Sequence, residues 1–296
     1  MSTVEQAPLS TAQTAAITRR ELLIWLFAAA VLVIALRYFQ IGNAALFWKA
    51  LDQINVFVCG ALCVAGWRLQ RYASPAPATS RDVMVVLLLL VLLCAMALAP
   101  HLLGVGVFLC LFVLYLVRLD DPSGELRASA VVLMSLATNF LLAPVVFRLF
   151  LPLFIRLDAF LIGNVLRLLD GSIEWRGSTF EHMEGAQRFG VTLIGACSSF
   201  NNVSAAVMVH MAWAMALRKH LTYFDGLAVL FTIALATALN VGRVSLSALG
   251  PDGYAFWHGN GTGVPTGALI FIVVQNIAMV LAGYATARWA SRAGTD

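Results

Sequence analysis

The sequence has little charge for its length. Its 296 residues include 19 basic and 15 acidic residues, so 11 % are charged, whereas a soluble domain carries roughly 25 %. Hydrophobic residues make up 61 %, and the mean hydropathy is +0.87. This scarcity of charge excludes a soluble domain and predicts an all-α polytopic membrane protein. The net charge of +4 follows from that architecture and gives no indication of nucleic-acid binding.

Cysteine spacing typical of metal sites is also missing. The five cysteines are Cys59, Cys63, Cys94, Cys110 and Cys197. They show no C-x-x-C pair, and the first four lie in apolar runs, which argues against a zinc site or a disulfide framework. Those four are interpreted as small core residues. We expect no metal and no organic cofactor.

The N-terminal region lacks a clear small-residue cleavage site. Arg19 and Arg20 precede the apolar residues 22–36, so we predict an uncleaved first span rather than a signal sequence. A spanning helix needs about 20 mostly apolar residues. The apolar runs predict about eight spans, near residues 22–36, 51–67, two within 83–117 divided near Pro100, 128–147, 198–217, 227–243 and 264–287.

The segment before the sixth span has a different pattern. A helical wheel of residues 153–170 places most polar side chains on one side and most leucines on the other, with Asp158 as an exception. The polar group is Arg156, Asn164, Arg167 and Asp170. This pattern predicts a helix lying on the membrane surface, and residues 172–180 favour a short hairpin.

These elements give a predicted organisation in five parts. They are a disordered cytoplasmic tail (1–20), five transmembrane helices (21–150), an extracytoplasmic interfacial helix and loop (151–196), a catalytic three-helix segment (197–290) and a cytoplasmic tail (291–296).

Basic residues set the predicted orientation, because cytoplasmic loops carry an excess of Lys and Arg. With both termini inside, eleven basic residues lie in inner segments: Arg19, Arg20, Arg68, Arg71, Arg81, Arg118, Arg127, Arg218, Lys219, Arg288 and Arg292. Short outer segments contain three, namely Arg37, Lys49 and Arg243. Five more arginines lie in the long segment 148–190, which the rule covers only in part. The bias predicts that both termini lie inside. We expect a multi-pass protein of the cell inner membrane.

Three residue types used in acyl transfer meet on the predicted outer face. Cys197 begins the sixth span, Arg243 ends the seventh, and His258 lies in the following loop, residues 250–261. A thiolate attacks a carbonyl, a histidine takes and returns the proton, and an arginine stabilises the oxyanion. The N-terminus of a helix also favours the thiolate form of a cysteine. The set is therefore typical of thiolate acyl transfer.

The order of these motifs resembles the exosortase/archaeosortase family of integral-membrane cysteine transpeptidases. The likeness rests on Ala196-Cys197-Ser198 at the start of one helix, Asn240-x-x-Arg243 at the end of the next, and a histidine-containing loop before the last helix. It covers about residues 153–287 in order, spacing and topology.

The resemblance implies that Cys197 is the nucleophile and that Arg243 and His258 complete the site. It also implies a secreted protein substrate that carries a C-terminal sorting signal: a short Pro-Glu-Pro-like motif, a transmembrane helix and a basic cluster. Acyl transfer would release that anchor, and a surface glycan or lipid would accept the protein.

Polar residues beside the thiol are expected to bind the substrate. They are Ser198, Ser199, Asn201 and Asn240. Ser199 stands where the family usually has glycine, so we expect its side chain to narrow the approach to the sulfur.

Other interpretations stay open for the individual residues. Cys197 could be a small core residue, Arg243 could extend to lipid headgroups, and His101 or His182 could replace His258 as the base. His210 lies 13 residues after Cys197, roughly 20 Å along a helix, so we expect it to hydrogen-bond inside the bundle instead.

Two other classes of protein remain as alternatives. A transporter or channel would be indicated by inverted repeats or by broken spans with charges near the middle of the membrane. The sequence shows no obvious repeat, and its spans contain few charges. A non-catalytic membrane assembly protein is the third alternative.

Overall fold

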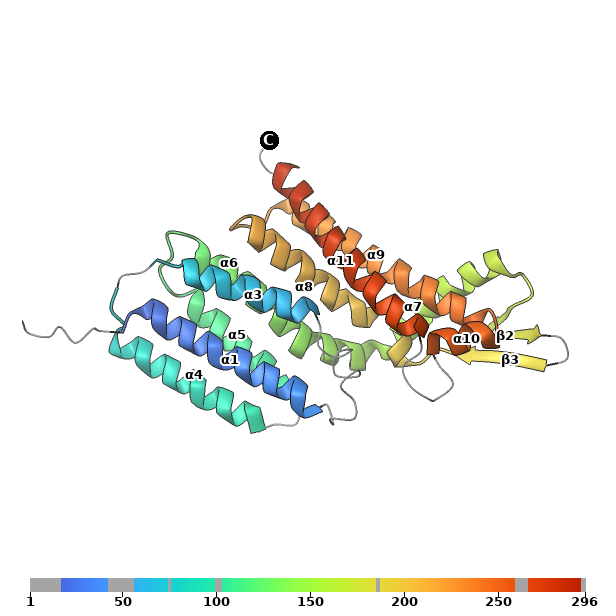
Figure 1. Ribbon diagram of the computed structural model, residues 1–296, viewed down its shortest axis with the longest axis horizontal. Helices are drawn as coiled ribbons and strands as arrows, with labels where there is room; N and C mark the ends of the chain where they lie inside the picture. Colours follow the sequence, from blue (N-terminus) through green and yellow to red (C-terminus); the bar gives the residue numbers. More distant parts are fainter. Residues whose placement is uncertain are drawn as a thin grey trace, which may run out of the picture.

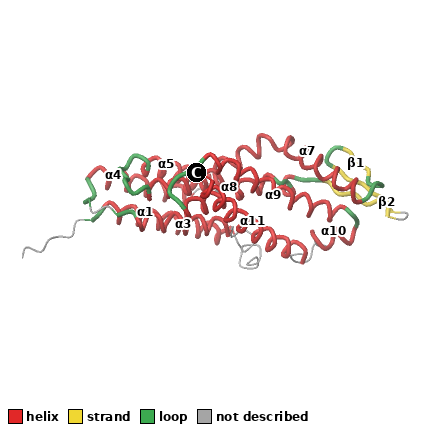
Figure 2. Tube along the Cα trace, turned by 90° about the horizontal axis from the view of Figure 1, so that it is seen from above, coloured by secondary structure: helices red, strands yellow, loops and turns green. Residues whose placement is uncertain are grey.

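Apolar runs of the sequence form helices that pass back and forth along the long axis of the molecule (Figure 1). The computed structural model describes residues 17–41, 56–73, 76–98, 103–184, 187–258 and 266–293. A small sheet lies at the end opposite the start of α1 (Figures 1 and 2). The predicted tails and the second-span residues 51–55 fall largely or wholly outside the described residues, as does Pro100.

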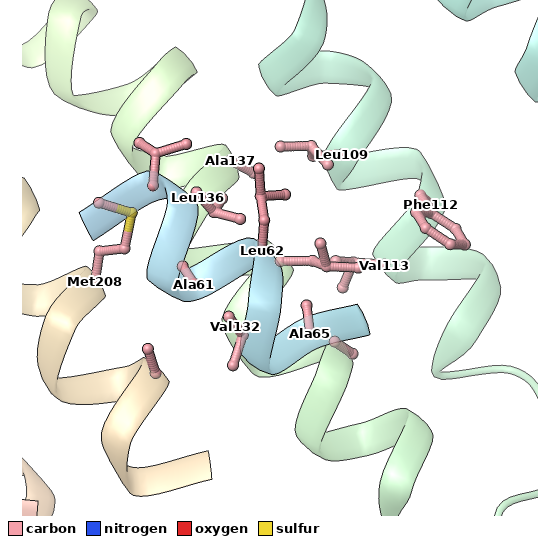
Figure 3. Close-up of a cluster of buried hydrophobic side chains, with 14 of the residues drawn as sticks. Ala61, Leu62, Ala65, Leu109, Phe112, Val113, Val132, Leu136, Ala137 and Met208 are labelled. Carbon is pink, nitrogen blue, oxygen red and sulfur yellow. The ribbon is translucent and has the colours of Figure 1, made fainter. Parts of the chain in front are cut away.

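The first half of the chain forms a bundle with small residues between its helices. It contains α1 (Arg19–Ile41), α3 (Val56–Arg71), α4 (Ser80–Leu98), α5 (Leu103–Leu116) and α6 (Glu125–Ala137). Ala61 and Ala65 of α3 are fully buried, and α3 packs closely on α6 and on α8. Leu62 lies between α5 and α6 (Figure 3). Such small contact residues let apolar helices approach closely.

The fifth predicted span and the predicted interfacial helix form one continuous helical segment, so the predicted break between them is wrong. α6 passes through a π-helical turn, Thr138–Leu142, into α7 (Ala143–Leu169). Pro152 lies inside α7 without ending it. The 45 residues span about 67 Å at 1.5 Å per residue. The segment is therefore much longer than the roughly 30 Å hydrocarbon layer.

A three-stranded antiparallel sheet follows α7, which extends the predicted hairpin by one strand. Its strands are β1 (Glu174–Arg176), β2 (Thr179–Glu184) and β3 (Gln187–Thr192), in the order β1-β2-β3. Phe180 pairs with Trp175 on one side and Val191 on the other. Buried side chains of the sheet form a second core with α7 and α9: Ala159, Ile162, Leu166, Ile173, Phe180, Val191, Leu193, Val241, Val244 and Ala248.

Four helices complete the chain. They are α8 (Phe200–Leu217), α9 (Tyr223–Ala248), α10 (Pro251–His258) and α11 (Thr266–Ala293). α10 corrects the prediction of a loop at this position. Proline at its first position and Asp252 in its first turn favour a helix start. Gly253 is required there, because an added Cβ would lie 2.7 Å from the Leu246 carbonyl oxygen of α9.

Among the described residues, three helical segments have the length and hydropathy of membrane spans: Glu125–Leu169, Tyr223–Ala248 and Thr266–Ala293. Two shorter apolar helices are Leu103–Leu116 and Asn202–Leu217. Large apolar side chains such as Leu88 and Leu168 are exposed, at 69 % and 87 %. These features indicate a mostly helical membrane protein, while the number of eight spans stays a prediction.

Buried ion pairs close the end of the bundle where α8 turns into α9. Arg68 of α3 binds Glu125 of α6 at 2.9 Å, and its Nε donates to the Met215 carbonyl at the end of α8 at 2.7 Å. Lys219 reaches the other oxygen of Glu125 at 2.7 Å. A carbonyl at a helix C-terminus has no partner within the helix. Arg68 therefore both neutralises Glu125 and provides a hydrogen-bond donor for the last turn of α8.

Candidate active site

Cys197 lies in a single tight turn between β3 and α8. The turn is a 3₁₀ helix, Gly195–Cys197, and the Cys197 N–H donates to the Ile194 carbonyl at 2.9 Å. The backbone at Ser198 is extended, and α8 starts only at Phe200. The expectation that Cys197 opens the helix is therefore wrong, because Ser198 and Ser199 separate its turn from α8.

The turn packs against α7 and the second core. Cys197 is half-buried and contacts the core formed by the sheet, α7 and α9. At Gly195, an added Cβ would lie 3.1 Å from Leu151 and 3.5 Å from Phe147 of α7. A side chain at position 195 would therefore require Leu151 to shift by a few tenths of an ångström. The position of Cys197 is thus set by α7 as well as by α8.

Asn240 of α9 links the turn to the candidate arginine. Its amide nitrogen donates to the Cys197 carbonyl at 2.8 Å and to the Ser199 hydroxyl at 3.1 Å. Its amide oxygen accepts from Nη2 of Arg243 at 3.2 Å. Asn240 is only 2 % exposed. A buried amide with both ends hydrogen-bonded fixes the geometry around it, because leaving either end unpaired would be costly.

Asp158 is the site residue that sequence reasoning missed. It lies on α7, is 4 % exposed, and accepts the Ser199 backbone N–H at 2.9 Å. Ser199 is the N-cap of α8, so a carboxylate lies where the helix dipole favours negative charge. The available signal was its interruption of an otherwise regular amphipathic pattern, which marks a polar group directed into the protein.

Arg243 lies one turn after Asn240 in the C-terminal part of α9 and is half-buried. Its guanidinium carbon is 4.9 Å from the ring centre of Phe271 in α11, within the range of a cation–π contact. The Ser247 hydroxyl donates to the Arg243 backbone carbonyl at 2.9 Å. α9 supplies the amide contact and α11 the ring contact, so packing of the two helices determines where the positive charge lies.

His258 is the last residue of α10. Its ring stacks on Tyr254 at 4.9 Å between centroids, and Tyr254 meets Phe189 of β3 edge-on at 6.1 Å. Burial lowers the pKa of His258 below 6.5, and the nearby positive charge of Arg243 lowers it further. Both effects favour the neutral imidazole that a general base requires.

The structure brings Cys197, Asn240 and Arg243 into one hydrogen-bonded set, with His258 within the electrostatic reach of Arg243. Within the described residues, no hydrogen bond joins Cys197 and His258. An unliganded catalytic pair is often separated until the substrate binds.

The remaining predicted residues differ in position. Ser198 and Ser199 are 3 % and 4 % exposed, and the Ser199 hydroxyl bonds Asn240. The added side chain of Ser199 is thus directed into the protein, contrary to the expectation that it narrows the approach to the sulfur. The side chains of Asn201 and His182, and all of His101, lie outside the described part of the chain.

A cavity of about 260 Å³ lies beside the turn, between α7 and α8. Phe147 and Phe200 line it and stack on each other at 5.7 Å between centroids, and Phe154 stacks on Phe200 at 4.0 Å. Asn139 accepts from the Ser204 hydroxyl at 2.8 Å, and the exposed side chain of Arg148 lines the rim. The cavity offers aromatic faces and a positive charge next to the segment that carries the thiol.

His210 has the structural role that its spacing predicts. It is fully buried, and its ring nitrogens lie 3.1 Å from the Thr286 hydroxyl and 3.0 Å from Asp225. Asp225 also binds Arg218. The group belongs to the closed end of the α8–α9 hairpin.

Comparison of the chain with known protein families, curated proteins and solved structures finds no match.

Proposed function

We propose that the chain is a membrane-embedded cysteine peptidase or transpeptidase of the exosortase/archaeosortase type. It would span the cell inner membrane about eight times, with both termini inside and Cys197 on the outer face. The observation that carries the proposal is the Asn240 amide, which joins the backbone of the Cys197 turn to Arg243 on α9.

The proposed substrate is a secreted protein still held by a C-terminal membrane anchor. Its polypeptide would bind beside the Cys197 turn, where the cavity lined by Phe147 and Phe200 offers aromatic surfaces. Arg148 at the rim favours an acidic residue in the recognised motif. This combination is compatible with a short motif that contains proline and glutamate.

The proposed reaction is acyl transfer through a thioester. Sγ of Cys197 bonds to the carbonyl carbon of the scissile peptide while its proton passes to His258. Arg243 stabilises the negative charge that develops on the carbonyl oxygen. The C–N bond then breaks, and the proton on His258 moves to the departing amine of the C-terminal anchor.

A second nucleophile completes the cycle. The hydroxyl or amine of a surface glycan or lipid attacks the thioester carbon, loses its proton to His258 and forms the new bond as the Cys197 thiolate departs. The thiolate regains the proton from His258. Water in place of the acceptor would make the protein a simple protease.

The direct test is the Cys197→Ala variant, co-expressed with a tagged secreted protein that ends in a candidate motif, an apolar helix and a basic cluster. We expect loss of C-terminal cleavage on immunoblots, because no other group replaces the thiolate. Cys110→Ala is the matched control, since Cys110 is also half-buried. Cleavage that requires the chain but is unchanged in Cys197→Ala, at normal protein level, would contradict the proposal.

A further inference from the structure

A groove between α4 and α5 is bordered by residues from the starts of α1 and α4 and from the end of α5. These helix ends lie at the end of the molecule opposite the small sheet (Figure 1). The groove encloses about 570 Å³. Three arginines line it: Arg19 at the start of α1, Arg81 at the start of α4 and Arg118 just after α5. We call it the basic groove. These residues are remote in sequence. They meet at one rim because α4 begins where the antiparallel α5 ends.

The walls below the rim are apolar. Val85 and Leu88 come from α4, and Leu111 and Leu114 from α5. Leu88 and Leu114 are 69 % and 50 % exposed. Leu88 lies seven residues after Arg81, which is about 10 Å along the helix. The groove therefore has positive charge at its rim and apolar walls below the rim. A phospholipid has the same arrangement, with a charged headgroup above its acyl chains.

The arginines of the rim differ in how they are used. Arg19 is bound by Asp82 at 3.0 Å, and Asp82 also accepts from the Thr79 hydroxyl at 2.8 Å and from the Tyr115 hydroxyl at 2.8 Å. Arg81 and Arg118 are exposed, and neither forms an ion pair within the described part of the chain.

The lining is positive overall. Three arginines face two carboxylates, those of Asp82 and Asp120. Asp82 is already committed to Arg19 and to the ends of α1 and α4. The charge available to a ligand is thus that of Arg81 and Arg118, reduced by Asp120. Two guanidinium groups at the rim of the groove can donate hydrogen bonds to the oxygens of a phosphodiester.

We propose that the basic groove binds an anionic phospholipid. Its phosphate would lie between Arg81 and Arg118, and one acyl chain would lie along Leu88, Leu111 and Leu114. Basic pockets between membrane helices are known to bind anionic headgroups. The site is independent of the proposed peptidase activity, because it lies at the opposite end of the bundle from Cys197.

Native mass spectrometry of the full-length protein in mild detergent tests the proposal, with phosphatidylglycerol or phosphatidylcholine added. We expect wild type to retain phosphatidylglycerol in preference to phosphatidylcholine. The double variant Arg81→Gln/Arg118→Gln should bind phosphatidylglycerol roughly thirtyfold more weakly, given the usual contribution of each arginine at an anionic membrane surface. Arg19 stays unchanged because its ion pair supports the fold.

The control double variant is Arg71→Gln/Arg127→Gln. It removes two exposed arginines from the same end of the bundle, outside the groove. Equal lipid binding by wild type and the groove variant, or an equal loss in the control, would overturn the proposal. Displacement of the lipid by equimolar inorganic phosphate would also overturn it, because the apolar walls would then contribute nothing. Elution and thermal unfolding in detergent confirm that each variant is folded.

Discussion

The two ends of the α8–α9 hairpin use buried polar groups in different ways. At the closed end, opposite charges meet directly: Asp225 binds Arg218 and lies 3.0 Å from His210. At the open end, Arg243 hydrogen-bonds the amide of Asn240, and Asp158 accepts a backbone N–H. An ion pair holds two helices together and neutralises both charges. A hydrogen bond to an amide or to the backbone also positions a charged group, but it neutralises less of the charge.

We infer from this difference that the closed end has a structural role and that, under the proposed function, the open end carries the reaction. A charge buried in a close ion pair is costly to move, because its partner would be left unpaired. A charge held by a neutral amide keeps more of its field for a ligand or a transition state. Variants at both ends of the hairpin test that division.

Asp225→Ala should be the most damaging change at the closed end. It leaves the buried Arg218 without its carboxylate and removes the cap of α9 formed with Thr222. We expect a loss of about 3–5 kcal/mol in the free energy of unfolding, measured by SDS titration in mixed micelles. Glu174→Ala is the control, because the exposed Arg176–Glu174 pair contributes under about 1 kcal/mol. If Asp225→Ala and Glu174→Ala lose the same free energy of unfolding, the buried ion pair stabilises the fold no more than the exposed one.

Asn240→Ala should act on the open end mainly through the reaction. The variant frees the Cys197 turn from α9 and removes an anchor of Arg243. Misplacement of reacting groups by about 1 Å costs roughly a hundredfold in rate, so we expect that loss in substrate cleavage. Asn164→Ala is the control, since the exposed Asn164 bonds only the carbonyl of Phe160 within its own helix. A cleavage rate equal to that of wild type would show that Asn240 does not position the site.

Asp158→Ala should have an intermediate effect. It removes the acceptor for the N-cap backbone of α8, so we expect a loss of about 1–2 kcal/mol in unfolding free energy. Asp158→Asn keeps an acceptor oxygen and should lose less than half of that. If the two variants are equally destabilised, the charge of Asp158 matters more than its hydrogen bond.

The pH dependence of His258 gives the smallest effect. Since burial and Arg243 lower its pKa below 6.5, cleavage should rise with pH through a midpoint below 6.5 and then level off. Arg243→Gln removes one cause and should move the pKa of His258 upward. Histidine-selective ¹³C NMR measures it without any need for activity, and His258→Asn assigns the resonance. A downward move would show that the Arg243 charge does not act on His258.

The helical fold was largely predictable, and its interruptions were not. Apolar runs located most helices within a few residues, because helix formation in an apolar chain depends on local composition. The predicted break after residue 147 was wrong because a π turn and Pro152 were accommodated inside one helix. The segment 251–258 was predicted as a loop because its glycine obscured a helix that packs on α9.

The candidate site was predictable as a set of residue types but not as a set of contacts. Cys197, Asn240 and Arg243 were identified from their order along the chain, and the structure joins them. Asp158 was missed because its partner Ser199 is 41 residues away. Ser199 was expected to point toward the approach to the sulfur, and only the packing of α9 against the turn shows that it points to Asn240.

Composition and local pattern establish an apolar, helical chain with few charges, because hydropathy and helix formation act locally. The tertiary structure sets which polar groups meet. The Cys197 carbonyl and the Asn240 amide are 43 residues apart, and Arg68 and the Met215 carbonyl are 147 apart. Such pairs depend on the distances between helices. Those distances are set by the crossing angles of the helices and the packing of their side chains, which no local sequence pattern encodes.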